Sequence, residues 1–308
     1  MDNTLTERFH DLFMGSQGAH GQTDVQGRKR SGKQEAKYQL VRAPLTIELV
    51  QKHLDGGLGV GSIPIDETNQ CFFGALDIDD YNLDLPALYA KVKRFKLPLV
   101  VCRSKSGGAH LYLFLSEKVA ASEVRDRLSE FASVLGWGNC EIFPKQEELL
   151  SERGDVGSFI NLPYQNQKYT TRYALKDGGD SLTLEEFLKV AEKSRLSSKQ
   201  LSKVKIGGSN EVLKDGPPCL QKLTEFGIPE GGRNMTLLNV GVYYKQFAPN
   251  DWKELLEKHN QDYCNPPIPA REVVLVQQQL EKKEYYYTCK QEPLHGHCNK
   301  SLCRSRKY

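Results

Sequence analysis

The 308-residue sequence has no apolar run long enough to cross a bilayer, and its mean hydropathy is -0.54. A membrane-spanning helix needs about 20 consecutive, mostly apolar residues. The first residues, Met1 to Thr4, show no signal-peptide pattern, and the chain contains no internal repeat. Its eight cysteines form no regular small disulfide framework, which is typical of a reducing compartment. We therefore expect a cytoplasmic protein with no membrane partner.

The sequence also has little net charge. Forty-two basic and 39 acidic residues leave +3, a balance that alone does not indicate a nucleic-acid binder. The distribution of charge is more informative, because residues 1–43 hold seven basic and five acidic residues and residues 281–308 hold seven and three. The basic ends therefore flank a middle region whose net charge is -3.

The order of apolar and helical segments predicts the fold class. Short apolar runs with strand character fall at 71–78, 97–102, 109–115, 140–143 and 158–163. Apolar residues at helical spacing fall at 45–56, 85–95 and 121–135. Strands that alternate with helices predict an α/β or α+β domain, with Cys71, Cys102 and Cys140 buried on its strands. Residues 14–37, rich in Gly, Gln, Ser and basic residues, are predicted to form a loop.

The pattern changes after Tyr173. Residues 182–203 are charged and helical, and Ile-Gly-Gly-Ser-Asn at 206–210 is typical of a linker. Further helical patterns occur near 220 and at 234–247, 252–260 and 270–283. We expect an N-terminal domain over 1–175, a helix and linker over 176–212, and a helical C-terminal domain over 213–308.

The sharpest local feature is an apolar run that ends in Asp77, Ile78, Asp79 and Asp80. Residues two apart on a strand project from the same face, so Asp77 and Asp79 would place two carboxylates side by side. Such a pair can bind one or two divalent cations. The same pattern is also ordinary turn chemistry at the end of a strand.

A second feature is the segment Arg-Ser-Lys-Ser-Gly-Gly-Ala-His at 103–110, which lies between two predicted strands. Such a hairpin could direct backbone N–H groups, Lys105 and His110 toward one anion, and a phosphate group is the expected ligand. The alternative is a plain hairpin in which the glycines serve the turn and the histidine is structural.

A third feature is the short predicted strand at 140–143, which carries Glu141 and is followed by Pro144 and Lys145. In this order the features resemble the three motifs of the archaeo-eukaryotic primase superfamily, most closely the primase domains of mobile elements and TOTE-type conflict systems. The resemblance covers roughly residues 38–175. Its matching segments are His53 to Gly56, the acid pair, Ser106 to His110, Glu141 to Gln146, and Leu162 to Gln165.

The resemblance implies a catalytic core like that of an RNA-recognition motif, with roles for particular residues. Asp77, Asp79 and Glu141 would ligate catalytic Mg²⁺ or Mn²⁺. The triphosphate of the incoming nucleotide would be held by His110 with Ser106 and Lys105. The full set expected at the nucleotide is Arg103, Lys105, Ser106, Gly107, His110 and Lys145.

The C-terminal region is cysteine-rich but lacks tight C-x₂-C pairs. Cys264, Cys289, Cys298 and Cys303 are separated by 24, 8 and 4 residues, with His295 and His297 nearby as alternative ligands. Four thiols in a reducing compartment suit a structural Zn²⁺. Large primase subunits hold an iron–sulfur cluster with four cysteines, so a cluster is the second interpretation, and thiols without metal are the third. The tyrosines at 285–287 and the basic residues Lys290, Lys300, Arg304, Arg306 and Lys307 suit phosphate contacts and base stacking.

Gly-Gly-Arg-Asn at 231–234, followed by Tyr243 and Tyr244, resembles the helical C-terminal modules of phage and plasmid primases. In those proteins the module connects to a helicase. We therefore expect a chain cut from a longer primase-helicase, with a helicase fused or associated on its C-terminal side. The expected context is bacterial, phage or plasmid.

Together these features predict a DNA primase and template-dependent DNA polymerase. It would join nucleoside triphosphates on single-stranded DNA by two-metal nucleotidyl transfer. One alternative is a repair polymerase that extends primers without starting them. The other is a non-enzymatic nucleic-acid-binding replication factor with structural carboxylates.

Overall fold

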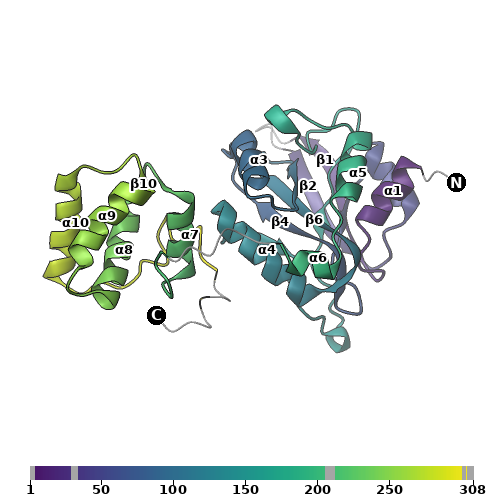
Figure 1. Ribbon diagram of the computed structural model, residues 1–308. Helices are drawn as coiled ribbons and strands as arrows, with labels where there is room; N and C mark the ends of the chain where they lie inside the picture. The colour runs from purple at the N-terminus through teal and green to yellow at the C-terminus, as the bar shows by residue number, and fades with distance from the viewer. Residues whose placement is uncertain (1–3, 29–33, 205–211, 300–302, 304–308) are drawn as a thin grey trace. The chain divides into compact units, whose positions relative to one another are not determined.

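The computed structural model describes residues 4–28, 34–204, 212–299 and 303. The chain divides into two compact units, which are described separately (Figure 1). Unit 1 comprises Met1–Ser129 and Cys140–Val204, and unit 2 comprises Glu130–Asn139 and Lys205–Tyr308. The predicted linker at 206–210 lies outside the described residues.

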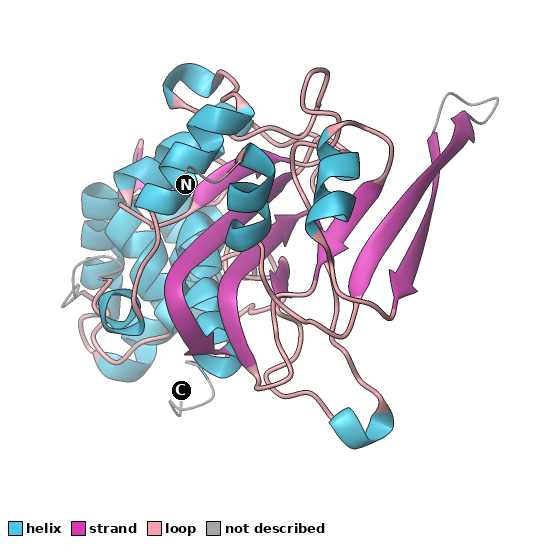
Figure 2. Cartoon of the chain, turned by 90° about the vertical axis from the view of Figure 1, so that its right-hand side faces the viewer, coloured by secondary structure: helices cyan, strands magenta, loops and turns pink. Residues whose placement is uncertain are grey.

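Unit 1 is a mixed domain of helices and two antiparallel sheets, which confirms the predicted fold class (Figure 2). One sheet has the order β2-β1-β3-β8 and the other the order β5-β6-β4-β7. The elements of this unit are α1 (Leu5–Leu12), β1 (His20–Arg28), β2 (Gln34–Val41), α2 (Ile47–Leu54), β3 (Gly59–Ser62), β4 (Gln70–Ile78), α3 (Leu85–Arg94), β5 (Val100–Arg103), β6 (Ala109–Ala120), β7 (Glu141–Phe143), β8 (Ile160–Asn161), α5 (Leu184–Lys193) and α6 (Ser198–Ser202). Helix α4 (Ala121–Leu135) begins in unit 1 and ends in unit 2.

The sheet that contains β4 is covered on both faces. On one face the ring of Phe13 lies 5.4 Å from that of Phe73 on β4 and 5.1 Å from that of Tyr112 on β6. On the other face Gly74 allows helix α4 to pack closely, because a Cβ there would lie 2.7 Å from a methyl carbon of Val124. Alternation along the strands therefore fixes which residues enter the core.

The prediction of a loop over residues 14–37 is wrong for residues 20–28 and 34–37, which are strands, whereas residues 14–19 are irregular as predicted. Strand β1 pairs with β2 along its whole length and with β3 near its start, so residues 20–28 and 34–41 form a hairpin at one edge of the sheet. The β1 sequence, His-Gly-Gln-Thr-Asp-Val-Gln-Gly-Arg, has almost no apolar alternation. Backbone pairing on two sides forms this strand without a hydrophobic pattern to reveal it.

The predicted end of the first domain at residue 175 also differs from the structure. Helix α5 belongs to unit 1, and its buried residues include Leu184, Phe187 and Leu188. The ring of Phe187 lies 6.2 Å from that of Phe9 on α1. Apolar positions at i, i+3 and i+4 make this helix amphipathic. The sequence prediction followed its many charged residues, whereas its apolar face packs in the core of unit 1.

His53 joins three parts of unit 1 through a fully satisfied imidazole. Its Nδ1 accepts a hydrogen bond from the backbone N–H of Val60 at 3.1 Å, and its Nε2 donates to the carbonyl of Pro163 at 2.8 Å. The ring is buried. The first and last segments of the family resemblance, around His53 and Pro163, are therefore held together by one neutral side chain.

Unit 1 should lose stability as the pH falls from 6.5 toward 4. Burial lowers the pKa of His53 to about 4 from its ordinary 6.5, so the unfolded chain takes up the proton first. The contribution of neutral His53 to the stability of unit 1 is therefore fully present above pH 6.5. Between pH 7.5 and pH 5 the free energy of unfolding should fall by about 2 kcal/mol. Hydrogen exchange of a peptide spanning β3, corrected for intrinsic rates, measures this loss in unit 1 alone.

The variant His53→Gln is the control for this prediction. It should be less stable at pH 7.5 and should no longer show this part of the pH dependence, because the titrating group is gone. An equal pH dependence in the variant and the wild type would contradict the assignment to His53.

Unit 2 is a helical domain, as the sequence predicts. Its elements are α7 (Pro218–Phe226), β9 (Ile228–Pro229), α8 (Arg233–Phe247), α9 (Trp252–Tyr263), β10 (Cys264–Asn265) and α10 (Ala270–Lys282). Helix α8 is buried from Thr236 to Tyr243. A Cβ at Gly241 would lie 2.3 Å from a methyl carbon of Leu280, so this glycine allows α8 and α10 to approach closely. Among the described residues, no helix combines the length and apolar character that a membrane span needs.

Candidate active site

The predicted acid pair lies at the end of β4, the strand between β6 and β7. Asp77 is directly opposite His110 on β6 and directly opposite Glu141 on β7. Residues opposite each other in antiparallel strands project from the same face. The sheet register therefore brings Asp77, His110 and Glu141 into one row, although 64 positions separate the first from the last in the sequence.

Asp77 has a buried carboxylate oxygen that is not satisfied. Its side chain is 18% exposed, and Oδ1 has no hydrogen-bond partner among the described residues. The same oxygen lies 3.4 Å from Nε2 of His110. The two groups would form an ion pair if the imidazole were protonated, but the contact does not have the geometry of a hydrogen bond. A buried acceptor without a donor is costly unless a ligand satisfies it.

Asp79 lies one residue beyond β4 and is exposed. Its pKa is raised, first by partial burial of the carboxyl group, then by the negative charges of Asp77 and Glu141, against an opposing effect of His110. The adjacent Asp80 serves the turn instead, since its Oδ1 accepts a hydrogen bond from the backbone N–H of Asn82 at 2.9 Å. Asp77 and Asp79 are thus the two acids at this end of β4 whose carboxylates a nearby cation would stabilise.

The donor set of Asp77 and Asp79 fits a divalent cation such as Mg²⁺ or Mn²⁺, which carboxylate oxygens bind. Glu141 is engaged otherwise, because its Oε2 lies 2.8 Å from Nζ of Lys145. Within the described ranges, no three His, Cys, Asp or Glu side chains are placed to hold one metal ion together. The third acid of the predicted set therefore lies opposite Asp77 but is paired with a lysine, and the binding of a cation by these acids stays a prediction.

The basic Gly/Ser segment forms the predicted hairpin turn between β5 and β6. Ser104 N–H donates to the carbonyl of Gly108 at 2.8 Å, and Gly107 has a φ of +104°, which favours glycine. A Cβ at Gly108 would lie 2.1 Å from the carbonyl oxygen of Ile78. The absence of that Cβ lets the turn press against the end of β4, directly before Asp79.

His110 is oriented by a chain of two hydrogen bonds. The hydroxyl of Tyr112 donates to the carbonyl of Asn161 on β8 at 3.1 Å, and Nδ1 of His110 lies 3.0 Å from the same hydroxyl oxygen. Since the single hydroxyl proton is used on Asn161, Nδ1 must be the donor to Tyr112. The other ring nitrogen, Nε2, therefore faces Asp77 and is the atom that can contact a ligand.

The other residues predicted at the nucleotide lie around the same turn or beside Glu141. Arg103 donates from Nη1 to the carbonyl of Thr171 at 2.8 Å. Ser106 is exposed, and its hydroxyl lies 3.3 Å from that of Ser104. Lys105 is half-buried, and burial lowers its pKa, with a further lowering by Arg172. Their roles at a nucleotide remain predictions.

The structure adds Arg172, which sequence reasoning did not single out. Its side chain is 6% exposed, and burial lowers its pKa. Its Nη1 reaches only the carbonyl of Leu162, at 3.5 Å, and no carboxylate of a described residue forms an ion pair with it. Arg172 and Lys105 are thus two neighbouring cations with a need for an anion. No local motif marks Arg172, so only its burial reveals it.

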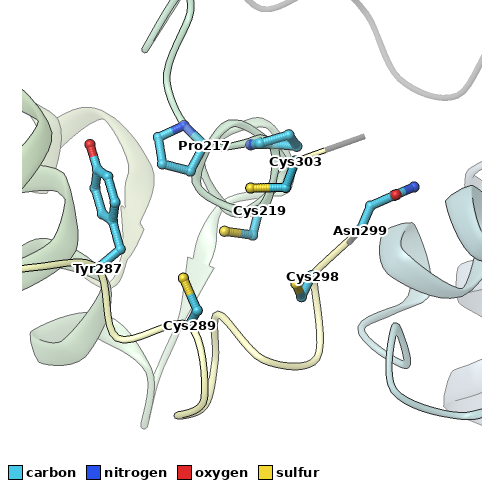
Figure 3. Close-up of a pocket in the computed structure, with 8 residues that line it drawn as sticks. Pro217, Cys219, Tyr287, Cys289, Cys298, Asn299 and Cys303 are labelled. Atoms are coloured by element: carbon cyan, nitrogen blue, oxygen red, sulfur yellow. The ribbon is translucent and has the colours of Figure 1, made fainter. Parts of the chain in front are cut away.

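The structure does not bring together all four cysteines predicted as one ligand set. Cys289, Cys298 and Cys303 line one cavity, and the fourth thiol there is Cys219 (Figure 3). Cys264 lies in β10, opposite Ile228 of β9, and does not line this cavity. The two histidines considered as alternatives do not line it either. The basic positions 300, 304, 306 and 307 lie outside the described residues.

Carboxylates at the end of a central strand, beside a cationic glycine turn, define a site suited to nucleotidyl transfer. Residues 18–175, more than half of the chain, match the family described as "TOTE conflict system, Archaeo-Eukaryotic Primase domain". The protein is therefore of the primase-type nucleotidyltransferase class. More specifically, it belongs to this TOTE-type family of the archaeo-eukaryotic primase superfamily, which confirms the resemblance seen in the sequence.

Five solved chains match this one in structure. One is from the "Crystal structure of primase RepB'", with 10% sequence identity and a TM-score of 0.30 over 98% of this chain and 96% of that chain. A search of curated proteins finds no match.

Proposed function

We propose that the protein is a DNA primase with template-dependent DNA polymerase activity, which starts and extends primers on single-stranded DNA. The observation that carries the proposal is the row Asp77, His110 and Glu141 on one sheet face, beside the Gly107–Gly108 turn. Membership of a primase family supports nucleoside triphosphates and nucleic acid as the substrates.

The acidic and the basic residues of this site would have different roles. Divalent cations held by Asp77 and Asp79, with Glu141 completing the site, would activate a 3′-hydroxyl and stabilise the pyrophosphate leaving group. Lys145 balances the charge of Glu141, 2.8 Å away. His110 Nε2, Lys105 and the hydroxyl of Ser106 would bind the triphosphate, since phosphate oxygens accept hydrogen bonds from cationic donors.

Arg172 would complete the triphosphate site. A guanidinium that is buried without a carboxylate partner gains most from a doubly accepting anion such as a phosphate. Its neighbour Lys105 has a pKa that is lowered first by burial and then by the charge of Arg172. The two cations therefore belong to one anion site.

Arg172→Ala should raise the KM for the nucleoside triphosphate about 10- to 100-fold, with a much smaller effect on kcat, because a charged hydrogen bond is lost. Arg172→Lys should recover part of the loss, since it keeps the charge without the planar fork. Steady-state primer extension at varied nucleotide concentration measures both constants. Arg153→Ala, at an exposed arginine, is the matched control and should leave KM unchanged. An unchanged KM in Arg172→Ala would contradict the assignment.

The test of the proposed activity is incorporation of labelled nucleotides on a primed single-stranded DNA template with Mg²⁺ or Mn²⁺. Growth of the primer that depends on the template supports the enzyme. Binding of the template without any incorporation, with or without a primer, would favour the alternative of a replication factor that binds nucleic acid.

The remaining alternative is an enzyme that extends primers but does not start them. Omission of the primer separates the two activities, because only a primase makes dinucleotides from two free nucleotides. A helicase on the C-terminal side is a further part of the proposal. It is supported by the helical unit 2 that begins α8 with the predicted Gly-Gly-Arg-Asn segment.

A further inference from the structure

Four thiols of unit 2 surround one cavity. The cavity has a volume of about 220 Å³ and is lined by Pro217, Pro218, Cys219, Tyr287, Cys289, Cys298, Asn299 and Cys303. Figure 3 shows Cys219 and Cys303 on one side of this space and Cys289 and Cys298 on the other. Cys219 comes from the first turn of α7, whereas the other three follow α10 in the sequence.

The fifth cysteine of unit 2, Cys264, lies apart from these four. It is in β10, opposite Ile228 of β9, and it is not among the residues that line the cavity. None of the eight cysteines is part of a disulfide, so the four at the cavity carry thiol groups of the kind that bind metals.

The two nearby histidines are directed to other partners. His297 Nδ1 lies 2.9 Å from the carbonyl oxygen of Ser133, and His295 Nδ1 lies 3.6 Å from Oε1 of Glu292. Beside Tyr287 and Asn299, the cavity is therefore lined by four cysteine sulfurs and by neither of these histidines. All-thiolate sets select soft centres such as zinc or an iron–sulfur cluster.

The segment that carries Cys298 is held in place by backbone contacts. Gly138 N–H donates to the carbonyl of Gly296 at 2.6 Å, and a Cβ at Gly138 would lie 2.4 Å from the carbonyl oxygen of Cys298. Cys298 N–H donates to the carbonyl of His295 at 3.2 Å. A chain segment without regular secondary structure is thus fixed around the thiols.

We propose that Cys219, Cys289, Cys298 and Cys303 hold one metal centre, and that the centre is an iron–sulfur cluster. A single tetrahedral zinc would draw its four sulfurs to about 2.3 Å from one point and leave no cavity between them. In the part of the chain that is described, no three such side chains are placed to share one ion. A cluster with four thiolate ligands instead occupies a volume between the cysteines. This proposal is independent of the proposed primase activity.

The experiment compares two buried cysteines, one inside the proposed ligand set and one outside it. Cys219 is 7% exposed and Cys264 is 5% exposed, so replacement of either by serine makes a similar change in packing. The full chain is purified without oxygen and analysed for iron, acid-labile sulfide and zinc. We expect about four irons and four sulfides per wild-type chain, as for a [4Fe–4S] cluster. Cys264→Ser should keep them and Cys219→Ser should lose most of them.

Cys289→Ser keeps the test informative if Cys219→Ser does not fold. Cys289 is exposed, so its replacement changes little packing, and loss of iron with an unchanged far-UV circular dichroism spectrum identifies it as a ligand. One zinc per chain, lost in Cys219→Ser alone, would overturn the cluster and keep the four ligands. Loss of metal in Cys264→Ser but not in Cys219→Ser, or wild-type protein without metal, would overturn the proposed centre.

Discussion

Asp77→Asn and Asp79→Asn should each lower the rate of primer extension on the order of 10³-fold, about 4 kcal/mol of transition-state stabilisation. Each variant removes a carboxylate charge from the pair that fits the divalent cations and leaves the side-chain shape unchanged. The reason is strongest for Asp77, whose buried Oδ1 has no hydrogen-bond partner in the described chain. Single-turnover extension of a labelled primer measures the effect.

Asp80→Asn is the matched control for the acid pair. Asp80 is next to Asp79, but its carboxylate accepts from the backbone N–H of Asn82, a role that an asparagine side chain can also fill. Its extension rate should stay within about threefold of the wild type, since surface changes of this kind have small effects. Equal losses in Asp80→Asn and Asp79→Asn would show that charge in general, rather than the pair at the strand end, matters.

The second large effect is expected at His110. His110→Ala should raise the KM for the nucleoside triphosphate about 100-fold, because it removes a hydrogen bond to a charged phosphate. The affinity for single-stranded DNA, measured by fluorescence anisotropy, should stay the same. A 100-fold loss of DNA affinity with an unchanged nucleotide KM would contradict the placement of His110 at the triphosphate.

Tyr112→Phe tests how His110 is positioned. The phenylalanine keeps the ring in the core but removes the hydroxyl that joins His110 Nδ1 to the carbonyl of Asn161. The KM for the nucleotide should rise about 10-fold, less than in His110→Ala. If Tyr112 had only a structural role, the variant would be less stable but its KM would not change.

Much of this site could be predicted from the sequence because its signals are local. An apolar run that ends in Asp77 and Asp79, and a Gly-Gly turn followed by His110, each indicate a strand end or a hairpin. The structure confirms those elements as β4, β5 and β6. The order of the three segments along the chain indicated the family. The sheet register shows how segments in this order come together, since it places Asp77 opposite His110 and Glu141.

The remaining parts of the site depend on tertiary packing. Arg172 is notable only because it is buried without a carboxylate, and exposure is not readable from a single basic residue in a polar segment. Lys145 was predicted at the nucleotide, but the structure shows it beside Glu141, four residues earlier. Strand β1, at residues 20–28, has almost no apolar alternation in its sequence, and its pairing with β2 and β3 is visible only in the folded chain.

The cysteines show the same limit in unit 2. Proximity in the sequence groups Cys264 with the three thiols that follow it. The fold instead brings Cys219, 70 positions before Cys289, to the cavity through the first turn of α7. A set of thiols with such a gap cannot be chosen from spacing, whereas the lining of the cavity shows which thiols lie together.

The most direct test of the central claim is synthesis on a single-stranded DNA template without any primer, with ribonucleotides and deoxyribonucleotides supplied in separate reactions. The wild-type protein should make dinucleotides and longer products with at least one set, and the double variant Asp77→Asn, Asp79→Asn should make none. Wild-type protein that extends a supplied primer but makes no product without one would contradict the claim that it is a primase. Products that persist in the double variant would contradict the placement of the active site at the end of β4.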